Sequence, residues 1–207
     1  MVIHPTEDAL VMGTHGRGII IIDDISPLRQ ITSEIIEDEL TFIKTKPTIM
    51  KDPGSFAGYS EVGDYVGPNP ISAAEIMYFM NKRHTFGKMT MKVFDAAGNE
   101  VADLAPGKSK GINGVQWNYR LKPPKTANGK IPVQAGLLGP VAPAGIYNVV
   151  INKGKKEFTG NIELANDPES IYTDADRTAQ QKATMQLFVL NEKVAYLVQQ
   201  VDMALPY

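Results

Sequence analysis

The 207-residue sequence contains no cysteine, a single tryptophan and only three histidines. Without cysteine the chain forms no disulfide, no cysteine metal site and no thiol nucleophile. The histidines His4, His15 and His84 have no partner at metal-ligand spacing, so no metal site is expected. Phosphate-binding loops, dinucleotide-binding glycine patterns and the Gly-x-Ser-x-Gly motif are also absent. We therefore expect neither a cofactor nor a catalytic residue.

Charge and hydropathy exclude two further classes of function. Lys and Arg number 21 and Asp and Glu number 23, which gives a formal net charge of -2 without a basic stripe. A nucleic-acid partner is therefore not expected. No apolar run is long enough to span a bilayer, so no membrane span is expected either. The N-terminus lacks the basic start and the apolar core of a signal peptide.

The adjacent carboxylates Asp23 and Asp24 are the nearest approach to a glycosidase pair. Such a pair needs two carboxyl groups about 5–10 Å apart across a substrate. Successive side chains on a strand point to opposite faces, so these two cannot both flank one bond. We expect one of them to cap the turn at Ser26–Pro27 instead.

Glycine and proline are abundant, with 18 and 14 residues, which suits a turn-rich β protein. Its centre is the segment 111–120, where Val115, Trp117 and Tyr119 alternate with polar residues. This period of two predicts a strand with one bulky apolar face. A lone tryptophan on such a face is usually the largest side chain of a sandwich core.

Short strands at regular spacing predict a mainly β fold with a β-sandwich at residues 71–168. The strands expected beside the tryptophan segment cover residues 74–80, 88–95, 100–104, 146–151 and 156–164. The side chains expected in the structural core include Trp117, Tyr119 and Tyr147.

Residues 1–30 carry a second β pattern. Segments 8–14 and 18–24 predict two strands joined by His15-Gly16-Arg17, and the glycines fit a tight hairpin connection. The run Ile19–Ile22 is continuously apolar, which predicts burial on both faces. An isolated hairpin cannot supply that burial, so neighbouring structure is expected.

The motifs Ile3-His4-Pro5, Leu10–Gly18 and Ile22–Leu28 resemble the end of the last blade in large bacterial sortilin-type β-propeller proteins with BNR-like repeats. Those proteins are often labelled glycosyl hydrolases. The resemblance implies that residues 1–30 are the terminal strands of a blade. The rest of the propeller would then belong to a longer protein, periplasmic or extracellular, that contains this chain. His15, beside Arg17 in the glycine hairpin, is expected to fix the loop or to close the propeller. The alternative is that His15 and Arg17 line the top of the propeller as contacts for an anion or a sugar.

A second resemblance covers the predicted sandwich. Val93-Phe94-Asp95 with Gly98, then Gly114–Asn118, then Pro143–Tyr147, are similar to Ig-like domains of the flagellar-hook-cap kind. The resemblance implies an Ig-like or fibronectin-like sandwich that serves as a spacer or docking module.

Residues 31–70 are expected to form a linker, because Pro and Gly interrupt any periodic pattern from Pro47 to Pro70. A short helix capped by Ser33 and a short strand at 40–44 are expected before it. A functional loop is the alternative interpretation of the Pro- and Gly-rich part.

Residues 172–205 predict a C-terminal helix, with Thr173–Asp176 able to cap its start. Apolar residues recur there at alternating spacings of four and three, which is the heptad stripe of a helix that packs along another. The stripe contains Leu187, Leu190, Val194, Leu197 and Val201, with Ala183 and Ala204 at its ends. Its partner is expected to be the sandwich, a second copy through residues 183–204, or a second helix of a hairpin that the sortilin-type resemblance implies.

Two function classes follow from these expectations. In the first, the chain is a non-catalytic accessory region that docks or spaces a larger secreted propeller protein, with carbohydrate or protein as its partner. In the second, it is the C-terminal part of a glycoside hydrolase-like enzyme whose catalytic carboxylates lie upstream of Met1. In both, the 207 residues themselves are expected to be inert.

Overall fold

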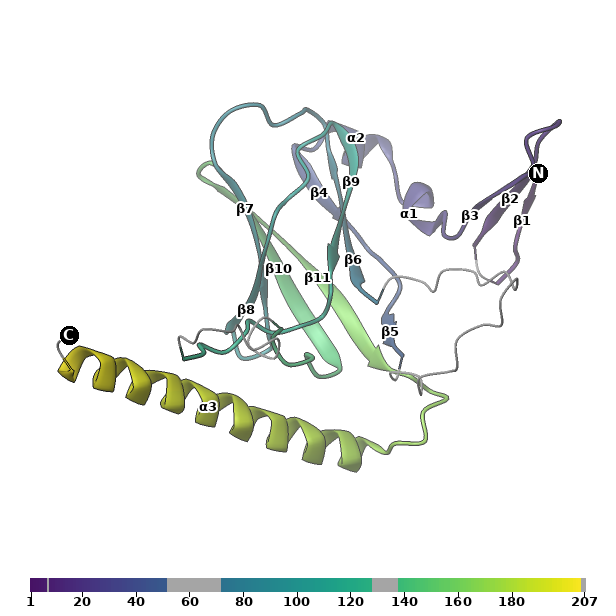
Figure 1. Ribbon diagram of the computed structural model, residues 1–207. Coiled ribbons are helices and arrows are strands. Elements are labelled where there is room, and N and C mark those ends of the chain that lie inside the picture. The colour runs from purple at the N-terminus through teal and green to yellow at the C-terminus, as the bar shows by residue number, and fades with distance from the viewer. Residues whose placement is uncertain (7, 52–71, 128–137, 206–207) are drawn as a thin grey trace.

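The computed structural model describes residues 1–6, 8–51, 72–127 and 138–205 (Figure 1). These residues are mainly β: they form three sheets, followed by one long C-terminal helix. The first sheet stands apart at the N-terminus, and the other two form the body of the molecule (Figure 1).

The N-terminal sheet is antiparallel, with the order β1-β2-β3. Its strands are β1 (Val2–Ile3), β2 (Leu10–Gly13) and β3 (Ile19–Ile22), so the hairpin predicted around His15 is present. The Thr14 N–H donates to the Gly18 carbonyl at 3.0 Å and closes the turn. Gly16 and Gly18 have φ of 78° and 84°, which glycine adopts without strain.

The body contains one sheet of three strands and one of five. The first has the order β4-β6-β9, with β4 (Leu40–Ile43), β6 (Ala74–Met80) and β9 (Gly111–Trp117) all antiparallel. The second has the order β5-β11-β10-β7-β8 and is antiparallel except for the parallel pair β5–β11. Its strands are β5 (Thr48–Met50), β7 (Met89–Phe94), β8 (Glu100–Leu104), β10 (Gly145–Lys153) and β11 (Lys156–Asn166).

One hydrophobic core is shared by both body sheets, because alternate side chains of each sheet point into the same buried cluster. Trp117 is 1% exposed, and its ring meets the edge of the Tyr147 ring at a centroid distance of 5.1 Å. The indole N–H of Trp117 donates to the Arg120 carbonyl at 3.1 Å, which satisfies its polar end. The core positions expected for Trp117 and Tyr147 are therefore confirmed.

The strand predicted at 111–120 ends earlier, at Trp117. Tyr119 has φ of 40°, a left-handed conformation that a strand residue does not adopt, and it is only partly buried against the core. The chain turns there because it pairs with residues 139–142 instead. The Ala142 N–H donates to the Tyr119 carbonyl and the Leu121 N–H to the Pro140 carbonyl, both at 2.8 Å.

The described part of the expected linker, residues 31–51, belongs to the body rather than to a loose connection. It supplies strand β4 to one sheet and β5 to the other. Two short helices precede these strands, α1 (Ser26–Arg29) and α2 (Ser33–Glu37). Thr32 rather than Ser33 caps α2, by accepting from the Ile35 N–H. The Pro- and Gly-rich remainder, 52–70, lies outside the described residues.

The C-terminal helix α3 (Asp174–Ala204) begins with a capping box. The Thr173 hydroxyl accepts from the Asp176 N–H at 3.2 Å, and the Asp176 carboxylate accepts from the Thr173 N–H at 2.9 Å. The helix crosses one end of the body as a single straight rod (Figure 1). It is not long and apolar enough to cross a bilayer, and neither is any other helix of the described residues.

Candidate interaction surfaces

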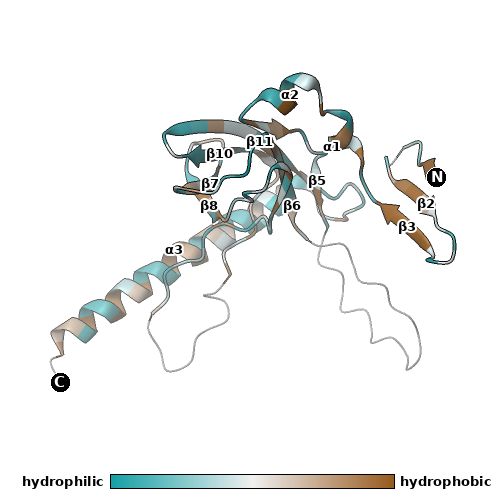
Figure 2. Cartoon of the chain, turned by 90° about the horizontal axis from the view of Figure 1, so that it is seen from above, coloured by the Kyte–Doolittle hydropathy of each residue, from teal (hydrophilic) through white to brown (hydrophobic). Residues whose placement is uncertain are grey.

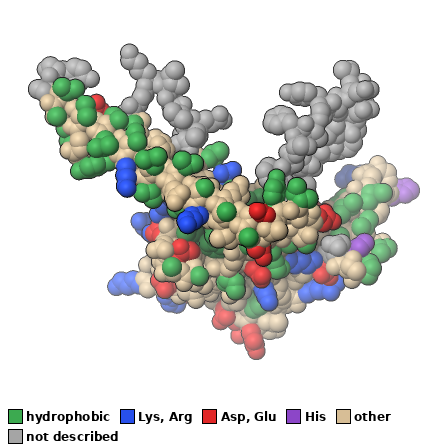
Figure 3. Space-filling view, turned by 90° about the horizontal axis from the view of Figure 1, so that it is seen from below, with side chains coloured by type: hydrophobic (Ala, Val, Ile, Leu, Met, Phe, Trp, Pro, Cys, Tyr) green, Lys and Arg blue, Asp and Glu red, His purple; other side chains and the backbone are tan. Residues whose placement is uncertain are grey.

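The heptad stripe of α3 is uncovered. Its five large side chains are 46% to 67% exposed, although they are apolar. They are Leu187, Leu190, Val194, Leu197 and Val201. Apolar side chains gather along the helix in the space-filling view from below (Figure 3). Of the three partners expected for this stripe, the sandwich is therefore excluded in this structure.

A different face of α3 meets the body. Ala195 is the only buried residue of the helix, at 2% exposure. Lys125 holds the helix through its Nζ, which donates to Gln199 Oε1 at 2.7 Å, and through its N–H, which donates to Glu192 Oε1 at 3.3 Å. These contacts are polar and few, so the helix is attached to the body without using its heptad stripe.

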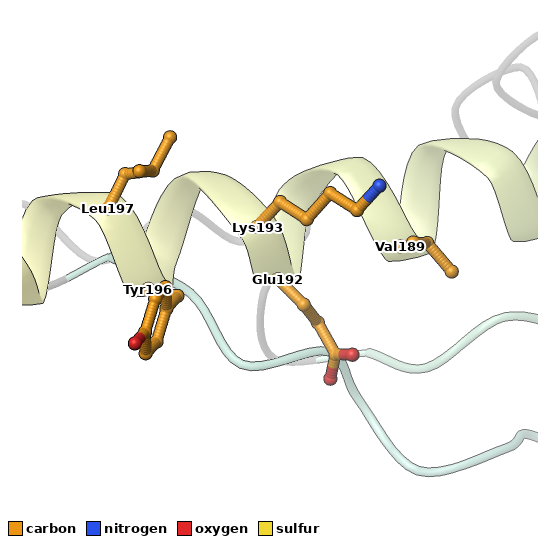
Figure 4. A pocket seen from close by; sticks show the side chains of 5 residues that line it. All are labelled: Val189, Glu192, Lys193, Tyr196 and Leu197. Atoms are coloured by element: carbon orange, nitrogen blue, oxygen red, sulfur yellow. The ribbon is translucent and has the colours of Figure 1, made fainter.

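A shallow hollow of about 420 Å³ lies beside the stripe on α3. Its walls are Val189, Glu192, Lys193, Tyr196 and Leu197, and Figure 4 shows Glu192 and Tyr196 pointing toward the chain below the helix. Each of the five lining residues lies one helical turn from another, so the hollow is a feature of the helix surface. Its lining is mostly apolar, with a single charged group of each sign.

A second hollow of about 560 Å³ lies between the start of α3 and the body. Its lining includes Met50, Pro143, Arg177, Gln181 and Met185. The Arg177 guanidinium donates to the Ser170 hydroxyl at 2.6 Å, so it anchors the segment before the helix. The lining holds no nucleophile next to a base, and we assign no chemistry to it.

The N-terminal sheet presents the second uncovered apolar surface. Ile19, Ile20, Ile21 and Ile22 are 41% to 72% exposed, so both faces of β3 meet solvent. Figure 2 shows β2 and β3 as a hydrophobic pair at the edge of the molecule. Burial on both faces, which the sequence predicts, is therefore not provided by the described residues.

His15 and Arg17 lie on the exposed connection between β2 and β3. Neither side chain has a hydrogen bond or an ion pair within the described part of the chain. The turn is closed by Thr14, whose hydroxyl donates to the Gly18 carbonyl at 2.7 Å. The loop-fixing role considered for His15 and Arg17 is therefore carried by Thr14, and their role as ligand contacts stays a prediction.

A third surface was not expected from the sequence. The β6–β7 loop (81–88), the β8–β9 loop (105–110) and the β10–β11 turn (153–156) meet at the end of the body opposite α3 (Figure 1). These three loops carry eight Lys and Arg residues and no Asp or Glu. We call them the basic end. No single segment contains a long run of positive charge, because these cations are divided among three segments of the sequence.

The ionisable groups show structural rather than catalytic surroundings. Hydrogen bonds from Lys156 and Lys153 hold the pKa of Glu39 below its ordinary value. Hydrogen bonds from Lys122 and Lys92 do the same for the pKa of Glu100. The side chains of these ion pairs range from 13% to 69% exposed. Ion pairs at or near the surface contribute little to stability.

Among the described residues, Glu75 is the one carboxyl group whose pKa is raised, by burial and then by the charge of Asp24. Asp24 is already engaged, because its Oδ1 accepts from the Ser26 N–H at 2.8 Å. This contact confirms the turn-capping role expected for one of the two adjacent aspartates.

No three His, Cys, Asp or Glu side chains converge as metal ligands in the part of the chain that the structure describes. The features that remain are surfaces rather than clefts: the α3 stripe, the β1–β3 sheet and the basic end. Comparisons with protein-family models, with curated proteins and with solved structures gave no match to this chain.

Proposed function

We propose that this chain is a non-catalytic accessory region of a larger secreted β-propeller protein, in which it serves as a spacer and docking module. Its periplasmic or extracellular location belongs to the same proposal. The support comes from the resemblance of residues 1–30 to the last blade of sortilin-type propellers and from the two uncovered apolar surfaces at the ends of a well-packed body.

The observation that carries the proposal is the exposure of β3 on both faces. A continuous run of four isoleucines is typical of a strand buried between two layers. In this chain the four are 41% to 72% exposed. Propeller blades pack on one another through both faces of each sheet. A neighbouring blade would cover Ile19–Ile22 in a way that the described residues do not.

The body is proposed to be an Ig-like sandwich. Ig sandwiches place strands A, B, E and D in one sheet and C, F and G in the other, with C′ beside C in the variable type. In chain order β4, β6 and β9 correspond to A, B and E, while β7, β8, β10 and β11 correspond to C, C′, F and G. The strand order β11-β10-β7-β8 then reads G-F-C-C′.

A tyrosine on β10 supports the same proposal. Ig domains have a tyrosine at the start of strand F whose hydroxyl bonds to the backbone a few residues upstream. Tyr147 is the third residue of β10, and its hydroxyl donates to the Pro143 carbonyl at 2.8 Å. Two departures are clear. No described strand corresponds to D. Trp117 lies on β9, the counterpart of E, whereas antibody domains carry the core tryptophan on C.

The test compares the 207-residue chain with the product of the whole reading frame that contains it. Hydrogen–deuterium exchange of the Ile19–Ile22 amides is expected to be fast in the chain alone and at least about tenfold slower in the longer product. Val149–Ile151 in the centre of the five-stranded sheet provide the control, with equal exchange in both. Unchanged exchange at Ile19–Ile22, or a frame without further blades, would overturn the docking role.

Glycoside hydrolysis separates the two function classes. The second class, part of a hydrolase-like enzyme, rests on the resemblance alone and places its carboxylates upstream. Release of reducing sugar from polysaccharides by the 207-residue chain itself would contradict the non-catalytic proposal.

A further inference from the structure

The basic end is a fixed platform rather than a set of independent loops. The His84 N–H donates to the Lys108 carbonyl at 3.0 Å, which joins the β6–β7 and β8–β9 loops. The Gly154 N–H donates to the Lys88 carbonyl at 3.2 Å, which adds the β10–β11 turn. Three segments that are far apart in the sequence therefore present their side chains together.

Buried polar groups hold the β8–β9 loop from beneath. The Tyr78 hydroxyl donates to the Gly107 carbonyl at 2.6 Å. The buried Asn113 accepts from the Ser109 N–H at 3.0 Å and donates to the Ser109 carbonyl at 2.8 Å. Lys108 and Lys110 extend from a backbone that is pinned on both sides, so the entropy lost on binding is small.

Most cations of the basic end are uncompensated. Glu39 pairs with Lys153 and Lys156. The other six are exposed and have no ion pair within the described ranges of the chain: Lys82, Arg83, Lys88, Lys108, Lys110 and Lys155. Carboxylates close to this end, apart from Glu39, lie outside the three loops and are fewer: Glu34, Glu37, Asp38, Asp103 and Glu157. The loops thus present an excess of positive charge although the whole chain is slightly negative.

Phe86 adds an apolar group to this charge. It lies in the β6–β7 loop next to Gly87, whose φ of 89° makes the turn, and it is 88% exposed. His84 Nε2 lies 3.1 Å from the Gly87 carbonyl and steadies that turn. No packing within the described residues accounts for a phenyl ring held out in solvent among cations.

We propose that the basic end docks on an anionic phospholipid surface, with Phe86 entering the headgroup layer and the six cations facing the lipid phosphates. Cations near such a surface and aromatic side chains at its interface are the two components of peripheral membrane binding. A nucleic acid or an acidic polysaccharide is less suited, because those chains stack on aromatic rings that line a groove, whereas Phe86 protrudes from a turn.

The experiment is co-sedimentation of the full chain with vesicles. Binding is expected to vesicles of phosphatidylcholine and phosphatidylglycerol at a ratio of about three to one, and not to phosphatidylcholine alone. Replacing Lys82 and Arg83 with Gln is expected to weaken partitioning about 25-fold, since each cation contributes about fivefold. Phe86→Ser is expected to weaken it about tenfold. Raised salt should weaken binding of the unsubstituted 207-residue chain, which is called the parent chain from here on.

The matched control replaces Lys182 and Lys193 with Gln, because these exposed cations lie on α3 at the other end and also lack ion pairs in the described structure. This variant is expected to bind as the parent does, and circular dichroism checks that every variant is folded. The proposal is overturned if anionic vesicles are not bound, or if the control loses as much binding as the loop variants. It is also overturned if only a soluble polyanion is bound and Phe86→Ser leaves that binding unchanged.

Discussion

At Gly160 the backbone of β11 touches the ring of an aromatic side chain from the opposite sheet. A Cβ built on this residue would lie 2.4 Å from Phe42 Cγ and 2.6 Å from Phe42 Cδ1. Glycine inside a strand is usually unfavourable unless another group approaches closely. Phe42 on β4 therefore explains the gap between Phe158 and Ile162 that interrupts the apolar face of β11.

The first prediction concerns this contact. Gly160→Ala is expected to lower the free energy of unfolding by about 1–3 kcal/mol, because the ring of Phe42 must shift within a packed core. Urea denaturation measures it. Gly13→Ala, where a Cβ meets no atom within 4 Å, is the control and should change stability by less than about 0.5 kcal/mol. The close approach would be refuted if Phe42→Ala failed to reduce the cost of Gly160→Ala.

Two buried tyrosines make the body sensitive to alkali. Burial raises the pKa of Tyr78 to about 12, against an ordinary value of 10.0. Burial, with a smaller effect from Asp95, raises the pKa of Tyr147 to about 12. In the unfolded chain both ionise near pH 10. The two protonated tyrosines therefore contribute fully to the free energy of unfolding below pH 10, and this contribution is lost as the pH rises from 10 to about 12.

The second prediction follows from this loss of stability at alkaline pH. Between about pH 8 and about pH 11 the parent chain should lose more free energy of unfolding than the variant with both Tyr78→Phe and Tyr147→Phe. At neutral pH the variant should be less stable by about 1 kcal/mol for each lost hydrogen bond. Urea titrations at the two pH values measure both effects. Tyr172→Phe, at an exposed site, should follow the parent, and a double variant with the parent's pH dependence would contradict the assignment.

At the scale of elements, α3 contacts the body with one face and leaves its apolar heptad stripe exposed on another. Its contacts with the body use polar side chains and Ala195, while the heptad stripe faces away. In heptad notation Leu187, Val194 and Val201 occupy a positions, Leu190 and Leu197 occupy the central d positions, and Ala183 and Ala204 occupy the outer d positions. β-Branched residues at a with leucine at d favour parallel two-stranded coiled coils. The stripe therefore suits a second copy of the same helix.

The third prediction is self-association through this stripe. Sedimentation velocity is expected to show a concentration-dependent dimer of the parent chain and a monomer when Leu190 and Leu197 are both replaced by Glu, because four charges would enter the seam. Lys182→Glu changes an exposed polar position off the stripe and should leave the dimer intact. A parent chain that stays monomeric at all concentrations would count against pairing with a second copy.

At the scale of the whole molecule, a body with its own hydrophobic core carries two surfaces whose apolar side chains are exposed. No buried side-chain nitrogen or oxygen of the described residues lacks a hydrogen-bond partner. The β1–β3 sheet and the α3 stripe, by contrast, leave apolar side chains in solvent. A satisfied centre with uncovered ends is what a spacer requires, because it transmits position between two partners without changing shape itself.

Positive charge is also concentrated at one end of the molecule rather than spread evenly over it. The basic end lies opposite α3, whose first turn carries Asp174 and Asp176. If both docking proposals hold, a dimer joined through α3 would present two basic ends, and two weak membrane contacts would act together with the gain of multivalency. The vesicle and sedimentation experiments test these two contacts separately.

Much of the local structure was determined by the sequence alone. Apolar patterns and turn signals predicted β6, β7, β8, β10 and β11 close to their observed bounds, because both kinds of signal are properties of short segments. The α3 helix, its cap at Thr173 and its heptad stripe are local for the same reason. The central position of Trp117 follows from its size and its place on an apolar face.

The tertiary structure alone decided which segments meet. Nothing local shows that β4 and β5 complete the two body sheets, since their strand partners lie 34 to 116 positions away in the sequence. The end of β9 at Trp117 depends likewise on the pairing of Tyr119 with Ala142. The sequence predicted the α3 stripe, but only packing shows that a different face of the helix meets the body. The basic end exists only in three dimensions, because folding brings together cations that are scattered along a nearly neutral chain.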